Sequence, residues 1–224
     1  MKLYYHPAST TSRIVMMFAA EDGIALDYQT VDLMTGEHLK PEFKAINPNC
    51  LVPVLDDDGF RLTESGAIIR YLAGKTGSAA YPKDLKERAR VDEALEWFYS
   101  NFYKDLGYGL IYPQLFPHHK RPNEAAQAGA IGWGKQQAQR WLGTLEQDLI
   151  GPDRKFLCGG KVTLADYVGA EMVTLGEVVH CRYQDYPNVR RWIGNMKALK
   201  SWGKVHEVAD GFVASLKDQQ FVAI

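Results

Sequence analysis

Four consecutive hydroxyl residues, Ser9–Ser12, form the first candidate for chemistry in the chain. The segment before them, Lys2–His6, is short and aromatic and is followed by Pro7, so it is predicted to be a strand. The segment after them repeats apolar residues at helical spacing, at Ile14, Met17 and Phe18. Hydroxyl residues cap helix N-termini, and the free N–H groups and dipole at such an end favour negative charge. The run therefore fits either a simple helix cap or a site for a thiolate or phosphate.

A second candidate is Val52-Pro53, at the start of a predicted strand. Proline removes one hydrogen-bond donor from a sheet, so it marks an edge or a special turn. A cis bond at this pair would turn the backbone groups of Val52 outward, where they can pair with a bound peptide. Only about 5–6% of X–Pro bonds are cis, so the residues alone do not favour that conformation.

The third candidate is Thr63-Glu64-Ser65, which precedes a helical pattern. The triplet fits a helix cap with a favourable first-turn acid. It equally fits a charge-matched ligand pair, in which Glu64 binds an ammonium group and Ser65 with the helix N–H groups binds a carboxylate. The second interpretation matches the amino-acid end of a peptide.

These candidates belong to a first third of the chain that alternates strand and helix patterns. A second strand is predicted over Asp27–Leu33, and Pro41–Lys44 is predicted to be a first helical turn. Strands over Val52–Leu55 and Phe60–Thr63 flank an Asp-Gly pair, which indicates a hairpin, and Glu64–Thr76 is helical. The order is β-α-β-α-β-β-α, with the first two strands parallel and the last two antiparallel.

The remainder of the chain carries almost only helical periodicity. Gly77–Pro82 is predicted to be a linker, which gives two domains, residues 1–77 and 85–224. Thr163-x-x-Asp166 resembles a capping box that opens a helix. Apolar stripes at helical spacing predict core packing, and they comprise Val91, Leu95, Phe98 and Phe102; Ala138, Trp141, Leu142, Leu145 and Leu149; Leu164, Tyr167 and Val168; Val189, Trp192, Ile193 and Met196; and Val205, Val208, Phe212 and Leu216.

Composition excludes several classes of function. Lys+Arg 26 against Asp+Glu 27 leaves a net charge of −1, so a basic field for nucleic acid or acidic membranes is missing. The longest stretch without Asp, Glu, Lys or Arg, Leu106–His119, is too short to span a membrane, and we recognise no signal peptide. Three widely spaced cysteines argue against a disulfide scaffold, a zinc ribbon or a dithiol redox motif. We expect a cytoplasmic protein without a metal.

Several motifs resemble, in their order and separations, those of cytosolic glutathione S-transferases. They are Tyr4–Ser9, Gly36–Phe43, Ile46–Pro48, Val52–Leu55, Leu62–Ser65, Arg88–Glu93, Tyr112–Phe116 and Thr163–Asp166. The resemblance covers about residues 4–210, and its nearest similarity is to the serine-type theta and delta classes, with a bacterial source expected. It implies a thioredoxin-like N-terminal domain, an all-helical C-terminal domain and a homodimer.

The resemblance also implies roles for individual residues. Ser9 corresponds to the catalytic hydroxyl, which holds the glutathione thiolate for attack on a small hydrophobic electrophile. Pro53 is implied to be cis. Contacts to glutathione, the co-substrate, carry over to His38, Lys40, Val52, Pro53, Glu64 and Ser65, with Lys40 near the glycine carboxylate. The electrophile is expected between the domains, where the candidates for its wall are Tyr108, Tyr112 and Phe116, which equally fit an interdomain core.

The sequence departs from the family pattern at three positions. Cys50 stands where delta-class members commonly have a histidine, and Gly66 where they commonly have an arginine. Ser100 stands where theta-like members can place an acid that reaches the partner subunit's site, and Asn101 and Asp105 are the alternatives.

Two other classes of function stay open on the sequence. Thiol–disulfide exchange needs a reactive cysteine after the first strand, where Ser9 and Ser12 stand, although Cys50 would serve if exposed. A non-catalytic glutathione-binding protein would reuse the same fold. Conjugation, dehalogenation and isomerisation would share all the glutathione residues.

Overall fold

A four-stranded sheet in the order β2-β1-β3-β4 forms the base of the N-terminal part, in a computed structural model that describes residues 1–224. β1 (Lys2–Tyr5) runs parallel to β2 (Asp27–Thr30) and antiparallel to β3 (Val54–Asp57). β3 forms a hairpin with β4 (Phe60–Leu62). The predicted parallel pair and the predicted hairpin are both confirmed.

Two strands are shorter than predicted, for local reasons. β2 ends at Thr30 because the Asp32 carboxylate accepts hydrogen bonds from the N–H groups of Met34 and Thr35, at 2.8 and 3.2 Å, and turns the chain. β3 begins at Val54 because Pro53 has no N–H group to donate to a sheet.

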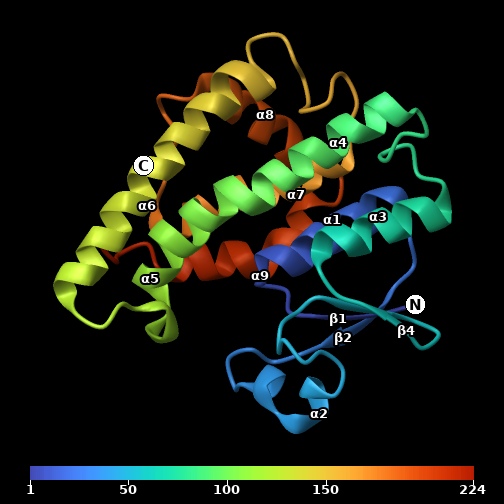
Figure 1. Cartoon of the computed structure of the whole chain (residues 1–224), viewed down its shortest axis with the longest axis horizontal. Coiled ribbons are helices and arrows are strands. Elements are labelled where there is room, and N and C mark those ends of the chain that lie inside the picture. The colour runs from blue at the N-terminus through green and yellow to red at the C-terminus, as the bar shows by residue number, and fades with distance from the viewer.

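Helices cover both faces of this sheet (Figure 1). α1 (Thr10–Asp22) and α3 (Ser65–Thr76) pack on one face, and the short α2 (Pro41–Lys44) lies on the other with the 3-10 helix Glu37–Leu39. The sheet pleat decides which residues face which side. Leu3 and Leu55 join the main core, whereas Val54 joins a small second core with Phe43.

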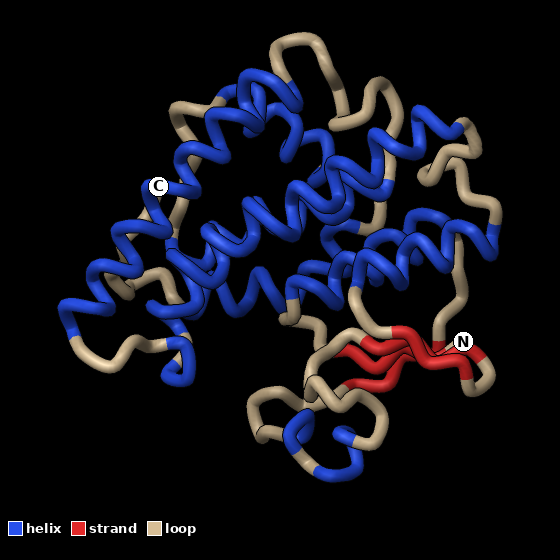
Figure 2. Tube along the Cα trace, viewed as in Figure 1, coloured by secondary structure: helices blue, strands red, loops and turns tan.

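The rest of the chain is helical, and the strands are confined to one end of the molecule (Figure 2). α4 (Leu85–Trp97) continues through π-helical turns over Phe98–Phe102 and Lys104–Ile111 into α5 (Tyr112–Leu115). The later helices are α6 (Glu124–Thr144), a π-helical turn over Leu145–Ile150, α7 (Leu164–Thr174), α8 (Pro187–Lys197) and α9 (Trp202–Ser215). None of the helices is long and apolar enough to cross a membrane.

Most of the predicted core stripes are buried, and the capping box is confirmed. The Thr163 N–H donates to Asp166 Oδ2 at 2.8 Å at the start of α7. The stripe on α9 is partly wrong, because Val208 is 49% exposed. α9 packs through Trp202, Val205 and His206 at its N-terminal end, and this face turns Val208 toward solvent.

The main core is continuous between the sheet-bearing part and the helical part. Leu3, Phe18 and Ile68 share one cluster with Phe98 and Trp192. The rings of Phe18 on α1 and Tyr167 on α7 lie 5.7 Å apart. Side chains of the helical part are therefore held at fixed positions beside the loops that follow β1 and precede α3.

Candidate active site

Ser9 lies at the junction of β1 and α1. It has extended backbone angles, φ −73° and ψ 122°, and its Oγ accepts a hydrogen bond from the Ser12 N–H at 3.3 Å. Ser9 is thus the N-cap of a 13-residue helix whose first N–H groups and dipole face the same loop. Its side chain is only partly buried, so a ligand can reach the hydroxyl.

The Thr11 and Ser12 hydroxyls make hydrogen bonds within the chain. Thr11 Oγ1 donates to the Val52 carbonyl at 3.1 Å and lies 3.2 Å from Ser9 Oγ. Because the single Thr11 proton points to Val52, the Ser9–Thr11 contact uses the Ser9 proton. Ser12 is fully buried, and its Oγ accepts from the His6 N–H at 3.4 Å. The Ser9 hydroxyl proton is therefore accessible, and it can turn from Thr11 Oγ1 to a bound anion.

The loop before β3 offers a backbone site beside Ser9. The Val52–Pro53 bond is cis, as the resemblance implied and the base rate alone did not. The Val52 N–H makes no hydrogen bond within the chain, and the Val52 carbonyl accepts only from Thr11. A carbonyl has two lone pairs, so Val52 presents a free donor and a half-used acceptor to an extended peptide.

Glu64 and Ser65 form a second polar cluster at the start of α3. Glu64 has φ 63° and ψ 113°, a conformation that costs energy for a non-glycine residue and is frequent at functional sites. Its exposed carboxylate has no ion-pair partner. Ser65 is buried, and α3 has no side-chain cap, so the N–H groups of Ser65 and Gly66 are free. A carboxyl acceptor and a set of free donors thus stand side by side.

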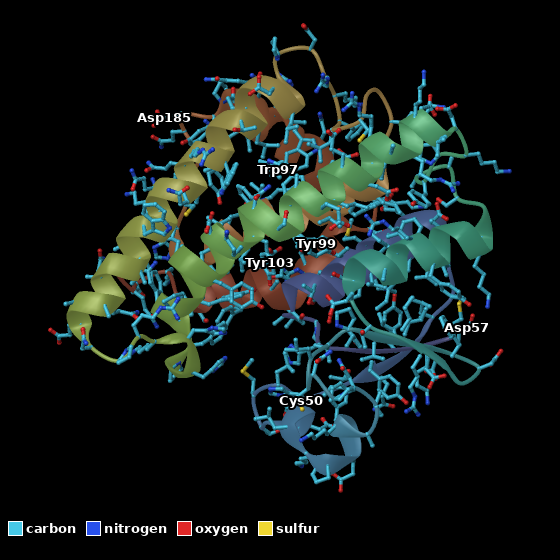
Figure 3. The ribbon with its side chains drawn as sticks, in the orientation of Figure 1. Cys50, Asp57, Trp97, Tyr99, Tyr103 and Asp185 are labelled. Carbon is cyan, nitrogen blue, oxygen red and sulfur yellow. The ribbon has the colours of Figure 1, made fainter.

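His38 and Lys40 lie on the segment that crosses the other face of the sheet. Lys40 is exposed and has no ion-pair partner, and His38 Nδ1 is buried without a hydrogen bond. Cys50 belongs to the same lobe as α2 (Figure 3), and its Sγ lies 3.8 Å from the Pro48 carbonyl. No hydrogen bond joins His38 or Lys40 to Ser9, Glu64 or Ser65, so their place in the site stays a prediction.

Aromatic side chains gather where α4 continues into α5. The rings of Tyr108 and Tyr112 are 5.0 Å apart, and those of Tyr112 and Phe116 are 5.6 Å apart. Two residues that the sequence reasoning missed complete this aromatic cluster. Tyr103 Oη lies 2.6 Å from Tyr112 Oη, and the His119 ring is 5.3 Å from that of Tyr112. Tyr103 and Tyr108 are five residues apart, a step that turns about 140° around an α-helix, so helical periodicity did not reveal this cluster. The π-helical turns, with their i→i+5 hydrogen bonds, bring the two rings to 5.4 Å.

This aromatic cluster reaches both polar loops. Burial raises the pKa of the Tyr112 phenol, while the hydroxyls of Tyr103 and Thr10 act in the opposite direction. Burial also raises the pKa of Tyr108, and the negative charge of Glu64 adds to that effect. The Thr10 hydroxyl and the Glu64 carboxylate thus both act electrostatically on this aromatic cluster.

The residues proposed to reach a partner subunit have different surroundings. Asp105 Oδ2 accepts from Trp141 Nε1 at 2.8 Å, and Ser100 Oγ donates to the Glu96 carbonyl at 2.6 Å. Both are thus engaged within the chain, whereas Asn101 makes no side-chain hydrogen bond. Three or more His, Cys, Asp or Glu side chains do not come together anywhere as a metal site.

Comparisons with known proteins point to one family. Family models for the N-terminal and C-terminal domains of glutathione S-transferase match residues 8–75 and 133–200. Glutathione S-transferase theta-2 of Homo sapiens is 34% identical over 227 aligned residues, which cover 98% of this chain and 89% of the human protein.

Solved structures extend the match to the whole fold. A Nilaparvata lugens delta-class glutathione transferase has a TM-score of 0.80 and 33% identity, over 96% of this chain and 98% of its own. Human glutathione transferase theta-2, solved with glutathione and an unknown ligand, has a TM-score of 0.82 and 29% identity, over 99% of this chain and 92% of its own. The predicted fold, a thioredoxin-like N-terminal part with an all-helical C-terminal part, is confirmed, and the chain belongs to the glutathione S-transferase family.

Proposed function

We propose that this chain is a serine-type glutathione transferase, in which Ser9 stabilises the glutathione thiolate for attack on a small hydrophobic electrophile. The observation that carries the proposal is the accessible Ser9 hydroxyl at the start of α1, beside the unpaired Val52 N–H. A hydroxyl donor, a helix N-terminus and a peptide-binding edge meet there within one loop pair.

The chemistry needs an anionic sulfur at neutral pH. A free thiol has a pKa of about 8.5, so the site must favour the thiolate. A charge-assisted hydrogen bond from Ser9 and the dipole of α1 both do so. Lowering the thiol pKa by about two units corresponds to about 2.7 kcal/mol of selective anion stabilisation. Ser9 acts as a hydrogen-bond donor in this scheme, and the sulfur is the nucleophile.

The rest of the tripeptide is assigned by matching charges. The Val52 N–H and carbonyl pair with the backbone of the cysteine residue, next to Pro53. Glu64 faces the γ-glutamyl ammonium, while Ser65 and the free N–H groups of α3 bind the γ-glutamyl carboxylate. Lys40 is assigned to the glycine carboxylate, and His38 is assigned as a further contact to glutathione. The aromatic cluster that contains Tyr108, Tyr112 and Phe116 forms the wall for the electrophile.

The thiol-redox alternative has less support. Cys50 precedes Val52 in a tight turn with φ 55°, and no helix N-terminus begins at Cys50 to stabilise its thiolate. The loop after β1, where an exchange cysteine would be needed, carries Ser9 and Ser12. The theta-class relatives likewise favour transfer over the non-catalytic alternative.

An activity panel tests the proposal. We expect glutathione-dependent turnover of at least one class among haloaromatics, haloalkanes, epoxides, isothiocyanates and peroxides. Detection of the glutathione conjugate by mass separates addition, or displacement of a halide, from peroxide reduction. Retention on immobilised glutathione without turnover of any class would instead support a non-catalytic binding protein.

Glu64→Gln is expected to weaken glutathione binding about tenfold, because glutamine keeps the shape of the side chain and removes the charge that faces the ammonium. Hydrogen bonds to charged groups contribute about 1.5–3 kcal/mol, and the lower end applies because Glu64 is exposed. Titration calorimetry measures the change. Glu207→Gln, an exposed acid on α9, is the matched control. An unchanged dissociation constant for Glu64→Gln would remove Glu64 from the site.

The protein is expected to form a symmetric dimer in the cytoplasm. Large apolar side chains are exposed on the isolated chain, including Leu85 at 78% and Phe60 at 51%, and such surfaces are commonly covered in two-fold oligomers. Light scattering should give twice the chain mass of 25.2 kDa at micromolar concentration. A stable species at the mass of one chain would contradict this prediction.

A further inference from the structure

Tyr99 connects the helical part of the chain to the start of α3. It lies on the π-helical turn Phe98–Phe102, and its Oη is 2.7 Å from Ser65 Oγ. π-Helical turns within helices occur frequently at functional sites. Tyr99 was not among the sequence-derived candidates, and its hydroxyl has no other hydrogen-bond partner.

The direction of the Tyr99–Ser65 hydrogen bond can be inferred from the acceptor that each hydroxyl proton has. Burial holds the pKa of the Tyr99 phenol well above its ordinary value, so the phenol keeps its proton at any working pH. The Tyr99 hydroxyl is half-buried and Ser65 Oγ is its one hydrogen-bond partner, whereas Ser65 itself is buried. When an anion accepts the Ser65 proton, donation from Tyr99 to Ser65 Oγ is the arrangement that gives both hydroxyl protons an acceptor.

Gly66 explains how the Tyr99 ring fits there. A Cβ atom at position 66 would lie 2.9 Å from Tyr99 Cε2 and 3.4 Å from Cζ. The ring thus packs against the backbone of the first turn of α3, and glycine is the residue that admits it. Gly66, where the sequence departs from the family pattern, thus leaves the space that the Tyr99 ring occupies.

Arg70 is the nearest cation on α3, but its charge is not available to a ligand at the start of that helix. Arg70 Nε donates to Asp92 Oδ1 at 2.7 Å, and Arg70 Nη2 donates to Glu96 Oε1 at 3.0 Å. Its charge is therefore already balanced by two acids of α4. The donors left at the start of α3 are the Ser65 hydroxyl and the free N–H groups, all of them neutral.

We propose that Tyr99 is a positioning residue for the γ-glutamyl carboxylate, acting by donating to Ser65 Oγ and so directing the Ser65 proton toward that carboxylate. The inference rests on the proposed function, because it takes Ser65 as a glutathione contact. Hydrogen bonds in a chain polarise one another, so the Tyr99 donation also strengthens the bond from Ser65 to the anion. Tyr99 thereby contributes to selectivity for a ligand that carries this carboxylate.

The test compares two peptides by titration calorimetry: glutathione and 4-aminobutanoyl-Cys-Gly, which lacks only the γ-glutamyl carboxylate. Tyr99→Phe is expected to weaken glutathione binding by about three- to tenfold, as for loss of one hydrogen bond, and to leave the affinity for the second peptide unchanged. KM for glutathione should rise by the same factor, with kcat and the pH titration of the bound thiol unchanged. Tyr186→Phe, whose hydroxyl contacts the Gln139 carbonyl at 3.5 Å, is the control.

Gly66→Ala provides a second test, because the added methyl group displaces the Tyr99 ring without changing any polar atom. It should reproduce the loss for glutathione and spare the second peptide. Equal weakening of both peptides in Tyr99→Phe would show a merely structural role and overturn the inference. Unchanged glutathione binding would also overturn it. Failure of the wild-type protein to bind glutathione at all would instead overturn the proposed function itself, and this inference with it.

Discussion

Replacing Ser9 with alanine is expected to lower turnover near neutral pH by about ten- to a hundredfold, with little change in glutathione affinity. In the proposed site the only glutathione atom that the Ser9 hydroxyl would reach is the sulfur, while Val52, Glu64 and Ser65 would bind the rest of the peptide. Losing a hydrogen bond to the charged form raises the pKa of the bound thiol by about one to two units. Below that pKa, each unit removes about nine-tenths of the thiolate. The deficit should therefore shrink as the pH rises and the variant's own thiol ionises.

The thiolate absorbance of the enzyme–glutathione complex, followed against pH, measures the effect directly. Ser12→Ala and Thr10→Val are the matched controls, since both side chains are buried and the Ser12 hydroxyl is turned toward the His6 N–H. A thiol titration that moves in either control, and stays in place in Ser9→Ala, would reassign the role. If no variant moves the titration, the helix terminus alone stabilises the thiolate.

Elements determined by local chemistry were predictable from the sequence. The β3–β4 hairpin follows from Asp58-Gly59, which adopts positive φ angles of 52° and 91°, as this type of two-residue turn requires. The start of α7 follows in the same way from Thr163 and Asp166, three residues apart. In these cases the residues that specify the structure are also the residues that make the contact.

The geometry of the site could be predicted less well from the sequence, because it depends on contacts between segments that are distant in the chain. Ser65 and Tyr99 are 34 residues apart, and no local pattern selects Tyr99 from the other tyrosines as the partner of Ser65. The cis bond at Val52–Pro53 was expected only from the resemblance, since most X–Pro bonds are trans. The predicted core stripe on α9 was partly wrong for a related reason. Apolar periodicity allows several helix faces, and the packing of neighbouring helices decides which face is buried.

Arg13 and Glu171 are the most distant of these partners, 158 positions apart in the sequence. Arg13 Nε donates to Glu171 Oε2 at 2.9 Å, and the two side chains are 6% and 1% exposed. Arg13 Nη1 also donates to the Ala8 carbonyl at 2.8 Å, next to Ser9. On the other side of Glu171, Oε1 is 2.9 Å from His206 Nε2, although the pair is not aligned as a hydrogen bond. This ion pair fixes the loop of the proposed catalytic hydroxyl against α7.

Glu171→Gln is expected to cost about 3–5 kcal/mol of unfolding free energy, because it leaves the Arg13 guanidinium buried without its counter-charge. Urea unfolding measures the change, with all variants compared at one protein concentration, because the stability of the expected dimer would depend on concentration. Glu93→Gln breaks the exposed pair with Arg90, whose side chains are 64% and 75% exposed, and should cost less than about 1 kcal/mol.

A double variant separates the buried charge from the loss of packing. Arg13→Met/Glu171→Met removes both charges and keeps side chains of similar length, so neither position holds an uncompensated ion. Replacing a whole buried pair with apolar residues is often neutral, whereas removing one partner is not. The double variant should therefore unfold at a higher urea concentration than Glu171→Gln. A double variant less stable than the single one would show that the lost contacts of Arg13, including its bond to the Ala8 carbonyl, outweigh the buried charge.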